Sequence, residues 1–397
     1  MQTWIPNALL LVQAVLAPTL YSASDLFQTR KILLIGGCIF SFIGAAIIPT
    51  ANDINRVIAG QALIGVGFST SPISYCIPSE ILPRKWRPLV GATASLAITG
   101  AFILRDTKDG WRNFYWIQIS LWGLVAVAIF VGYRPSKRHS RLDQLSCRQK
   151  IAEIDLIGSG LLTTGLALLL SGMTLGGDLY AWTNSRVICT IVVGRVILVA
   201  FGLYETYIIK TGILPHSLFR SDTPKAGRNA TICILLIAVE GFVSFAYFIF
   251  FPALTATLFE TRPMLIVARL EAFWGGIIIS SSISGLLSSR MRSIREPLAV
   301  GLLLFTAGNI GLATVQPDDS VSSVAFAALT GLGCGVMLVL VVAGIQLSVP
   351  HKLIATSTAV IVSVRAVFAV VATAVFAAAF RSRLTGKLPA YVAQVAL

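Results

Sequence analysis

The sequence predicts an all-α protein that crosses a membrane many times. Apolar residues make up 56% of the 397-residue chain and charged residues only 12%. That is about half of the charged fraction that a soluble domain carries. Residues 4–20 and 32–50 contain no charged side chain, and the short polar stretch between them carries Asp25, Arg30 and Lys31. Two uncharged runs with a charged break between them are typical of two membrane helices joined by a short loop.

Runs of this kind recur to the end of the chain. A hydrocarbon core about 30 Å thick needs about 20 apolar residues in a helix. Helices are favoured because a lone strand would leave its backbone unpaired in lipid, and period-two alternation is absent. Twelve spans are predicted: 4–22, 32–51, 57–77, 89–104, 113–133, 156–177, 187–208, 230–252, 264–287, 297–315, 323–347 and 354–380. We expect small residues within them, such as Gly331, Gly333 and Gly335, to let helices pack closely.

The basic residues between the runs predict the orientation. If the 23–31 loop is cytoplasmic, the cytoplasmic loops hold 19 Lys or Arg residues and the opposite loops hold nine. This asymmetry follows the positive-inside rule. The net charge of +14 therefore indicates orientation in a bilayer, and we expect no binding to nucleic acid.

Similar loops occur at matching places in the two halves of the chain. Residues 21–31 follow the first span, and the comparable stretch 285–295 follows the ninth. Two spans further on, the basic stretch 83–87 is matched by 350–352. Matching loops indicate a duplicated bundle of the kind that secondary transporters contain. The basic loop 134–153 and the spans 156–177 and 187–208 have no counterpart in either half.

Three motifs resemble a known family. The stretch with Ser24, Asp25, Arg30 and Lys31 resembles the loop after the second helix of the major facilitator superfamily. The run Ser-Glu-Ile-Leu-Pro-Arg-Lys-Trp-Arg-Pro at 79–88 resembles the fourteen-helix drug:proton antiporters of fungi, as does Trp-Arg-Asn-Phe-Tyr-Trp at 111–116. Together they are most similar to the trichothecene efflux pump family. That resemblance implies two six-helix bundles plus two extra central helices, with the first and last helix lacking here.

The same resemblance implies three parts of the chain. Residues 1–133 would form the N-terminal bundle, with family helices two to six. Residues 134–228 would contain the basic cytoplasmic loop and two linker helices. Residues 229–397 would form the C-terminal bundle, with family helices nine to thirteen.

Charged loops are the candidate gates. Asp25, Arg30 and Lys31 would form a latch that holds the inward gate closed, and the alternative is an ordinary solvated turn. The matching loops add Glu80, Arg84 and Arg290 to the gating candidates.

Polar residues inside the spans are the candidates for a substrate or proton pathway. A charged side chain at a helix centre costs about 2.5 to 3.5 kcal/mol on insertion scales, so it usually has a function or a partner. Glu240 is the predicted proton or cation site, with Arg269 as its neighbour or a substrate contact; the alternative is a static Glu–Arg pair. Gln61 occupies a position where the family often carries an arginine tied to proton coupling. The remaining candidates are Glu271, Gln346 and Arg365.

The expected function is secondary transport. The chain lacks a G-x-x-x-x-G-K-[ST] loop, so ATP is not expected as its energy source. We expect no enzyme activity, no cofactor and no metal. The prediction is proton-coupled export of a small amphipathic molecule by a monomer in the plasma membrane, with the vacuolar membrane as the alternative. The other hypotheses are a siderophore-iron transporter and a truncated homologue that does not transport.

Overall fold

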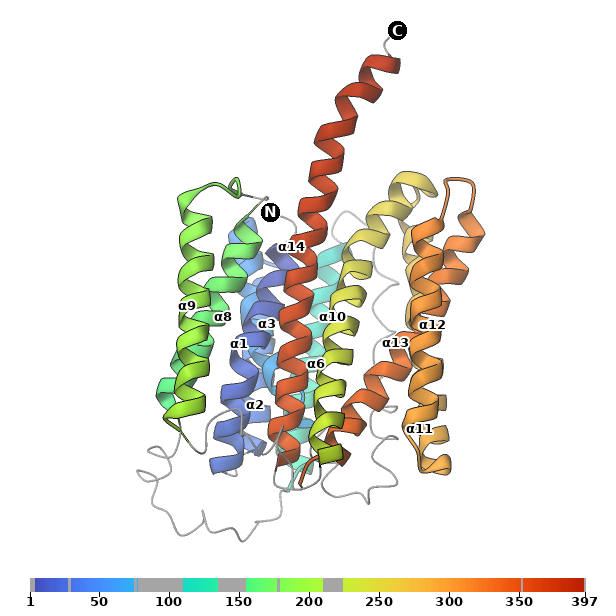
Figure 1. The fold of residues 1–397 in the computed structure, drawn as a ribbon. Helices are drawn as coiled ribbons and strands as arrows, with labels where there is room; N and C mark the ends of the chain where they lie inside the picture. Colours follow the sequence, from blue (N-terminus) through green and yellow to red (C-terminus); the bar gives the residue numbers. More distant parts are fainter. Residues whose placement is uncertain are drawn as a thin grey trace.

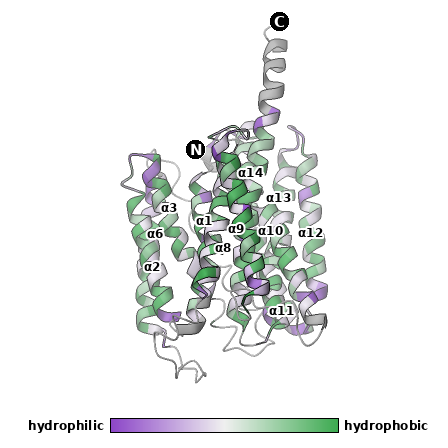
Figure 2. Cartoon of the chain, turned by 60° about the vertical axis from the view of Figure 1, so that its left-hand side comes forward, coloured by the Kyte–Doolittle hydropathy of each residue, from purple (hydrophilic) through white to green (hydrophobic). Residues whose placement is uncertain are grey.

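The computed structural model describes residues 4–27, 30–74, 77, 110–134, 155–176, 179–209, 224–350 and 353–395. Eleven helices occur in this part of the chain (Figure 1): α1 (Trp4–Phe27), α2 (Arg30–Ile47), α3 (Ile54–Thr70), α6 (Gly110–Gly132), α8 (Leu156–Leu175), α9 (Ser185–Tyr207), α10 (Pro224–Leu258), α11 (Pro263–Met291), α12 (Arg295–Thr314), α13 (Ser320–Ser348) and α14 (Ile354–Val395). Ten of these are long and apolar enough to cross a membrane, and α3 is shorter, with 17 residues. Figure 2 shows apolar residues along the helices and hydrophilic residues mostly near their ends.

The helices confirm the all-α membrane class that the sequence predicts. Eleven of the twelve predicted spans coincide with a helix, and the twelfth, 89–104, lies outside the described residues. Several predicted ends are wrong, and the third span is predicted too long, because α3 ends at Thr70 and not at residue 77. The helix α10 continues through Pro252 to Leu258, and α14 continues to Val395 instead of ending near residue 380. Hydropathy marks only the part of a helix that lies in hydrocarbon, so a helix that extends beyond it is predicted too short.

Neighbouring helices along the chain run up and down. The helices α1, α2, α3 and α6 pack side by side, and α8 pairs with α9 next to α1. In the second half, α11 and α12 pack on α13, while α10 contacts both α13 and α14. The α8–α9 and α12–α13 connections lie at the same end of the molecule, at the top of Figure 1. The division of the chain at residues 133 and 228 stays a prediction.

Three glycines of α13 lie where other helices come closest. A side chain on Gly331 would meet the backbone of Phe273 in α11, and one on Gly333 would meet the backbone of Phe305 in α12. One on Gly335 would meet α11 again. Small residues at such points let backbones come into van der Waals contact, which drives helix association in lipid. The expectation of close approach at these glycines is therefore confirmed.

The two halves of the chain meet at α1 and α14. Leu10 and Ala14 of α1 pack against Ala366, Ala369 and Val370 of α14. The Ser363 hydroxyl donates a hydrogen bond to the Ala14 carbonyl oxygen at 2.5 Å. This contact places α14, which carries Arg365, between the two groups of helices.

Candidate functional site

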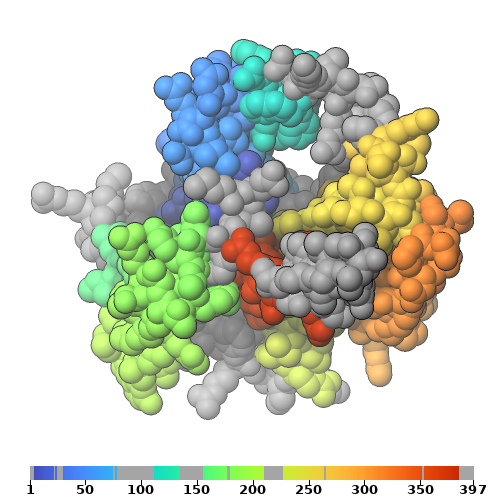
Figure 3. All heavy atoms as spheres, turned by 90° about the horizontal axis from the view of Figure 1, so that it is seen from above, coloured from blue at the N-terminus to red at the C-terminus, as the bar shows by residue number. Residues whose placement is uncertain are grey.

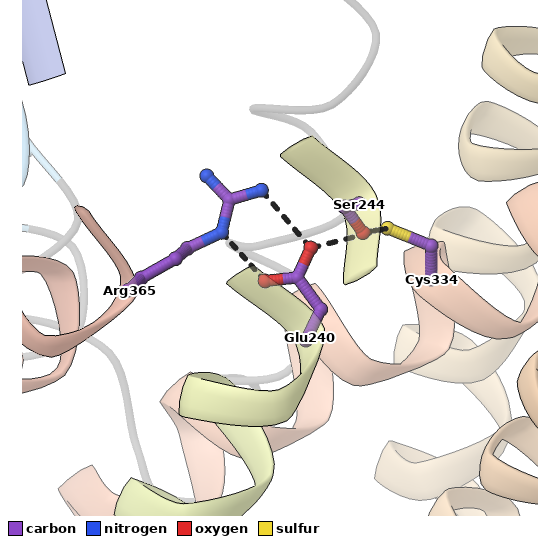
Figure 4. A network of polar contacts seen from close by, with 4 residues as sticks. All are labelled: Glu240, Ser244, Cys334 and Arg365. Atoms are coloured by element: carbon purple, nitrogen blue, oxygen red, sulfur yellow. Dashed lines mark hydrogen bonds and ion pairs between the residues drawn. The ribbon is translucent and has the colours of Figure 1, made fainter. Parts of the chain in front are cut away.

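A charged pair joins α10 to α14 (Figure 4). The Arg365 Nε donates to the Glu240 Oε2 at 2.6 Å, and one terminal nitrogen of the guanidinium donates to Oε1 at 3.0 Å. The Glu240 side chain is fully buried, whereas 26% of the Arg365 side chain is exposed. A bidentate pair of this kind is among the stronger charged contacts in proteins.

The carboxylate also contacts α13. The Cys334 thiol donates to the Glu240 Oε1 at 3.3 Å, and the Ser244 hydroxyl lies 3.4 Å from the same sulfur. Ser244 is on α10, one turn after Glu240. Glu240 is therefore the point at which α10, α13 and α14 meet through polar contacts.

The residue after Glu240 explains how α10 and α14 come close enough for this contact. A Cβ atom on Gly241 would lie 2.6 Å from the Arg365 carbonyl oxygen, which is too close for any other residue. The Arg365 guanidinium also lies 5.2 Å from the centre of the Phe245 ring, an arrangement in which a cation is attracted to the ring face.

The pair joins two helices through opposite charges. Two charges inside a membrane are stable only when they compensate each other, and removing one leaves the other uncompensated. The buried Glu240 carboxylate therefore fixes the position of Arg365, and the pair holds α10 and α14 together.

Arg269 lies elsewhere, which corrects one expectation. Its guanidinium donates to the carbonyl oxygen of Ser320 at 3.0 Å and to the hydroxyl of Ser320 at 2.7 Å. It also lies 5.5 Å from the Phe259 ring. The prediction that Arg269 neighbours Glu240 is wrong, because Arg365, more distant in the sequence, takes that place. Glu271 is partly buried, and its Oε1 has no hydrogen-bond partner within the described residues.

The two glutamines of the predicted pathway each link a pair of helices. Gln61 on α3 donates to the Tyr115 hydroxyl on α6 at 2.7 Å. Gln346 on α13 donates to the Thr358 hydroxyl on α14 at 2.9 Å. Both side chains are buried, so each amide stabilises the contact of its two helices. Neither contact involves Glu240.

Sequence reasoning missed Ser244 and Cys334. Ser244 carried a usable signal, since a residue four positions after Glu240 lies on the same face of a helix. Cys334 stands between Gly333 and Gly335, which indicated close packing but not a polar partner. Among the described residues, Cys38, Cys189, Cys233 and Cys334 are not in disulfide bonds.

The structure describes only some of the gating candidates. Lys31 donates to the Phe130 carbonyl oxygen at 2.7 Å and lies 5.4 Å from the Phe130 ring, so it attaches α2 to the end of α6. Arg30 begins α2, and Arg290 is exposed in the last turn of α11. The Asp25 side chain, Glu80 and Arg84 lie outside the described part of the chain. The latch therefore stays a prediction.

Residues 8–396 match the sequence model of the fungal trichothecene efflux pump family, TRI12. The chain belongs to this family. The TRI12-family chain is 27% identical to an MFS-type transporter, ucsD, of Acremonium, over 91% of this chain and 61% of that protein. It is 25% identical to the trichothecene efflux pump TRI12 of Trichoderma arundinaceum, over 92% of this chain and 62% of that protein. It thus spans less than two thirds of the length of both relatives.

Solved structures confirm the fold of this TRI12-family chain. The human organic anion transporter MFSD10 matches with a TM-score of 0.62 and 14% identity, over 96% of this chain and 78% of that one. The proton:xylose symporter XylE, of the major facilitator superfamily, matches with a TM-score of 0.56 and 12% identity, over 95% of this chain and 79% of that one. The predicted major facilitator fold is therefore confirmed.

Proposed function

We propose that the protein is a secondary transporter that exports a small amphipathic molecule, such as a toxin, secondary metabolite or drug, by proton-coupled alternating access. Membership of an efflux pump family supports the transport of a small molecule. The observation that carries the coupling is the Glu240–Arg365 pair next to the contact of α1 with α14.

In this proposal the pair is the coupling element. While Glu240 is charged, Arg365 holds α14 against α10 and one arrangement of the bundles is favoured. When an aqueous path from one side delivers a proton to Glu240, the attraction is lost and the other arrangement becomes accessible. A ligand or proton can shift such an equilibrium only by the difference between its affinities for the two states. The change of solvent around Glu240 between the two states supplies that difference.

The proposal has three further parts. The segments 1–133, 134–228 and 229–397 are the N-terminal bundle, the linker part and the C-terminal bundle. The inward gate is formed by charged residues of the cytoplasmic loops, which include Asp25 and Arg290. The protein acts as a monomer in the plasma membrane, with protons as the coupling ion. Coverage of the chain by membrane-capable helices supports the multi-pass arrangement.

The replacement Glu240→Gln tests the coupling. The complete natural gene is expressed in a host that lacks efflux pumps, and accumulation of candidate compounds is measured at several external pH values. We expect normal expression, residual export and loss of its pH dependence, because glutamine keeps the shape but carries no proton. The matched control is Glu205→Gln, a buried glutamate of α9 outside the candidate pathway, for which we expect an unchanged pH profile.

Two outcomes would contradict the proposal. Lost expression with an unchanged pH profile of the remaining export would assign the pair a static role in packing. Equal accumulation in cells with and without the unaltered protein would favour the homologue that does not transport.

A further inference from the structure

A row of aromatic side chains leads away from the Glu240–Arg365 pair. The Arg365 guanidinium lies 5.2 Å from the centre of the Phe245 ring, and the Phe245 ring lies 5.6 Å from Phe248. Phe248 in turn stacks on Trp274 of α11, with ring centres 4.9 Å apart and planes 17° apart. All four side chains of this row, Arg365, Phe245, Phe248 and Trp274, are partly exposed.

The row begins where the two halves of the protein meet. Phe245 packs against the cluster that contains Leu10 and Ala14 of α1 and Ala366 of α14. In the view from above, an opening separates the blue and cyan helices α2 and α6 from the yellow stretch at the end of α10 and the start of α11 (Figure 3). The start of the row therefore lies beside the contact of α1 with α14, where the two groups of helices meet.

Buried rings support the row from behind. Tyr247 stacks on Phe273 at 4.3 Å and on Phe251 at 4.5 Å, and all three belong to the buried core of the second half. Phe248 and Phe273 meet edge to face at 5.3 Å. Contacts with a close-packed core restrict the rotamers of Phe248 and Trp274, so little order has to be created when a ligand lies against them.

The exposed polar group at the start of the row, the Arg365 guanidinium, is positively charged. The Arg365 side chain is 26% exposed and the Glu240 side chain is fully buried behind it. A molecule lying on the rings would meet the guanidinium and not the carboxylate. A guanidinium only donates hydrogen bonds, so it accepts a carbonyl, hydroxyl or carboxylate oxygen and repels a cation.

We propose that Arg365, Phe245, Phe248 and Trp274 bind a ligand with a flat apolar ring body and an oxygen acceptor or carboxylate at one end. The site selects against cationic amphiphiles. The inference rests on the proposed transport function, for which it supplies the substrate class. Rings that lie against aromatic side chains gain binding free energy beyond that of the area that they bury.

Three pyrene probes with different ends test the selectivity. Pyrenebutanoate, pyrenebutanol and pyrenebutyl-trimethylammonium share one ring body and differ in charge. Their dissociation constants for the purified full-length protein in lipid nanodiscs are measured by fluorescence anisotropy, with empty nanodiscs as the blank. We expect the butanoate and the butanol to bind at least tenfold more tightly than the ammonium probe. Equal or tighter binding of the ammonium probe would overturn the proposal.

Variants test the residues. We expect Phe248→Ala to weaken binding of pyrenebutanol about tenfold, because the ring loses its central contact. The control is Phe376→Ala, which removes an aromatic side chain that is 39% exposed and packs on Phe242 and Phe250 instead. We expect it to leave all three dissociation constants unchanged. Equal effects of the two variants would contradict the site.

The head-group preference is assigned with a double variant, since a single change at Arg365 leaves a buried carboxylate without compensation. We expect Glu240→Gln with Arg365→Gln to retain binding of pyrenebutanol and to lose the discrimination between butanoate and ammonium. A retained preference would show that another group selects the charge. Binding is measured without transport, so an intact order of affinities in a protein that exports nothing would refute the transport function alone.

Discussion

Arg365 binds both oxygens of the Glu240 carboxylate although 125 residues separate the two in the sequence. The pair links the first and last helices of the second half of the chain, α10 and α14. Its carboxylate is fully buried and its guanidinium is not. The contact between α10 and α14 therefore depends on the opposite charges of these two residues.

The first prediction concerns the stability of the pair. We expect Arg365→Gln to lower the free energy of unfolding by about 3 kcal/mol, since it leaves the carboxylate unpaired. The double variant with Glu240→Gln should recover most of that loss, because no buried charge remains. Thermal denaturation in detergent measures both. A double variant that is as unstable as the single one would show that shape, not charge, decides the contact.

The second prediction concerns the close contact beside the pair. Gly241→Ala places a methyl group 2.6 Å from the Arg365 carbonyl oxygen, so α10 and α14 have to separate. We expect the free energy of unfolding to fall by about 1 to 3 kcal/mol. The hydrogen bonds between Arg365 and Glu240 should also weaken. The control is Gly275→Ala, where nothing lies within 4 Å of the new methyl group. There alanine should stabilise the helix or leave the melting temperature unchanged.

The third prediction separates Arg269 from the coupling. Arg269→Met removes two hydrogen bonds to Ser320, and we expect a loss of about 2 kcal/mol in stability. Ser320→Ala keeps the carbonyl acceptor and should lose about half as much. Neither variant should change the pH dependence of export. A changed pH profile for Arg269→Met would restore this arginine to the proton pathway.

The fourth prediction concerns orientation. Asp143→Cys lies in the basic 134–153 loop, and Asp318→Cys lies in the α12–α13 connection. An impermeant maleimide should label position 318 in intact cells and position 143 only after permeabilisation. The unaltered protein, with its own cysteines, is the background control. Labelling of position 143 from outside would reverse the orientation.

The sequence predicted the membrane spans because hydropathy and loop charge are local properties. Residues 32–50 and 297–315 are uncharged or nearly so over the length of a bilayer, and helices are found at both places. Helix ends outside the hydrocarbon were predicted less well. The apolar pattern predicts a span that ends at residue 252, yet α10 continues beyond Pro252 for more than a turn. Proline is tolerated within a membrane helix because neighbouring helices and nearby side chains can satisfy the backbone groups that it leaves unpaired.

The partner of Glu240 could not be predicted from local patterns. The sequence marked Glu240, Arg269 and Arg365 as costly inside a membrane, but cost alone does not select which two residues meet. Of the two arginines, Arg269 is the nearer to Glu240 in the sequence, so a local pattern favours it. The packing of α10 on α14, permitted by Gly241, brings Arg365 there instead.

The contact of α1 with α14 has a consequence for the rate of any movement between the halves. Ala14, Ala366 and Ala369 have no side-chain rotamers to rearrange, so at these three positions a shift of the helices requires no change of side-chain conformation. The hydrogen bond from Ser363 to Ala14 and the nearby charged pair would have to loosen in any such shift. Bulkier residues at these alanines would slow the exchange between states even where they left both states equally stable.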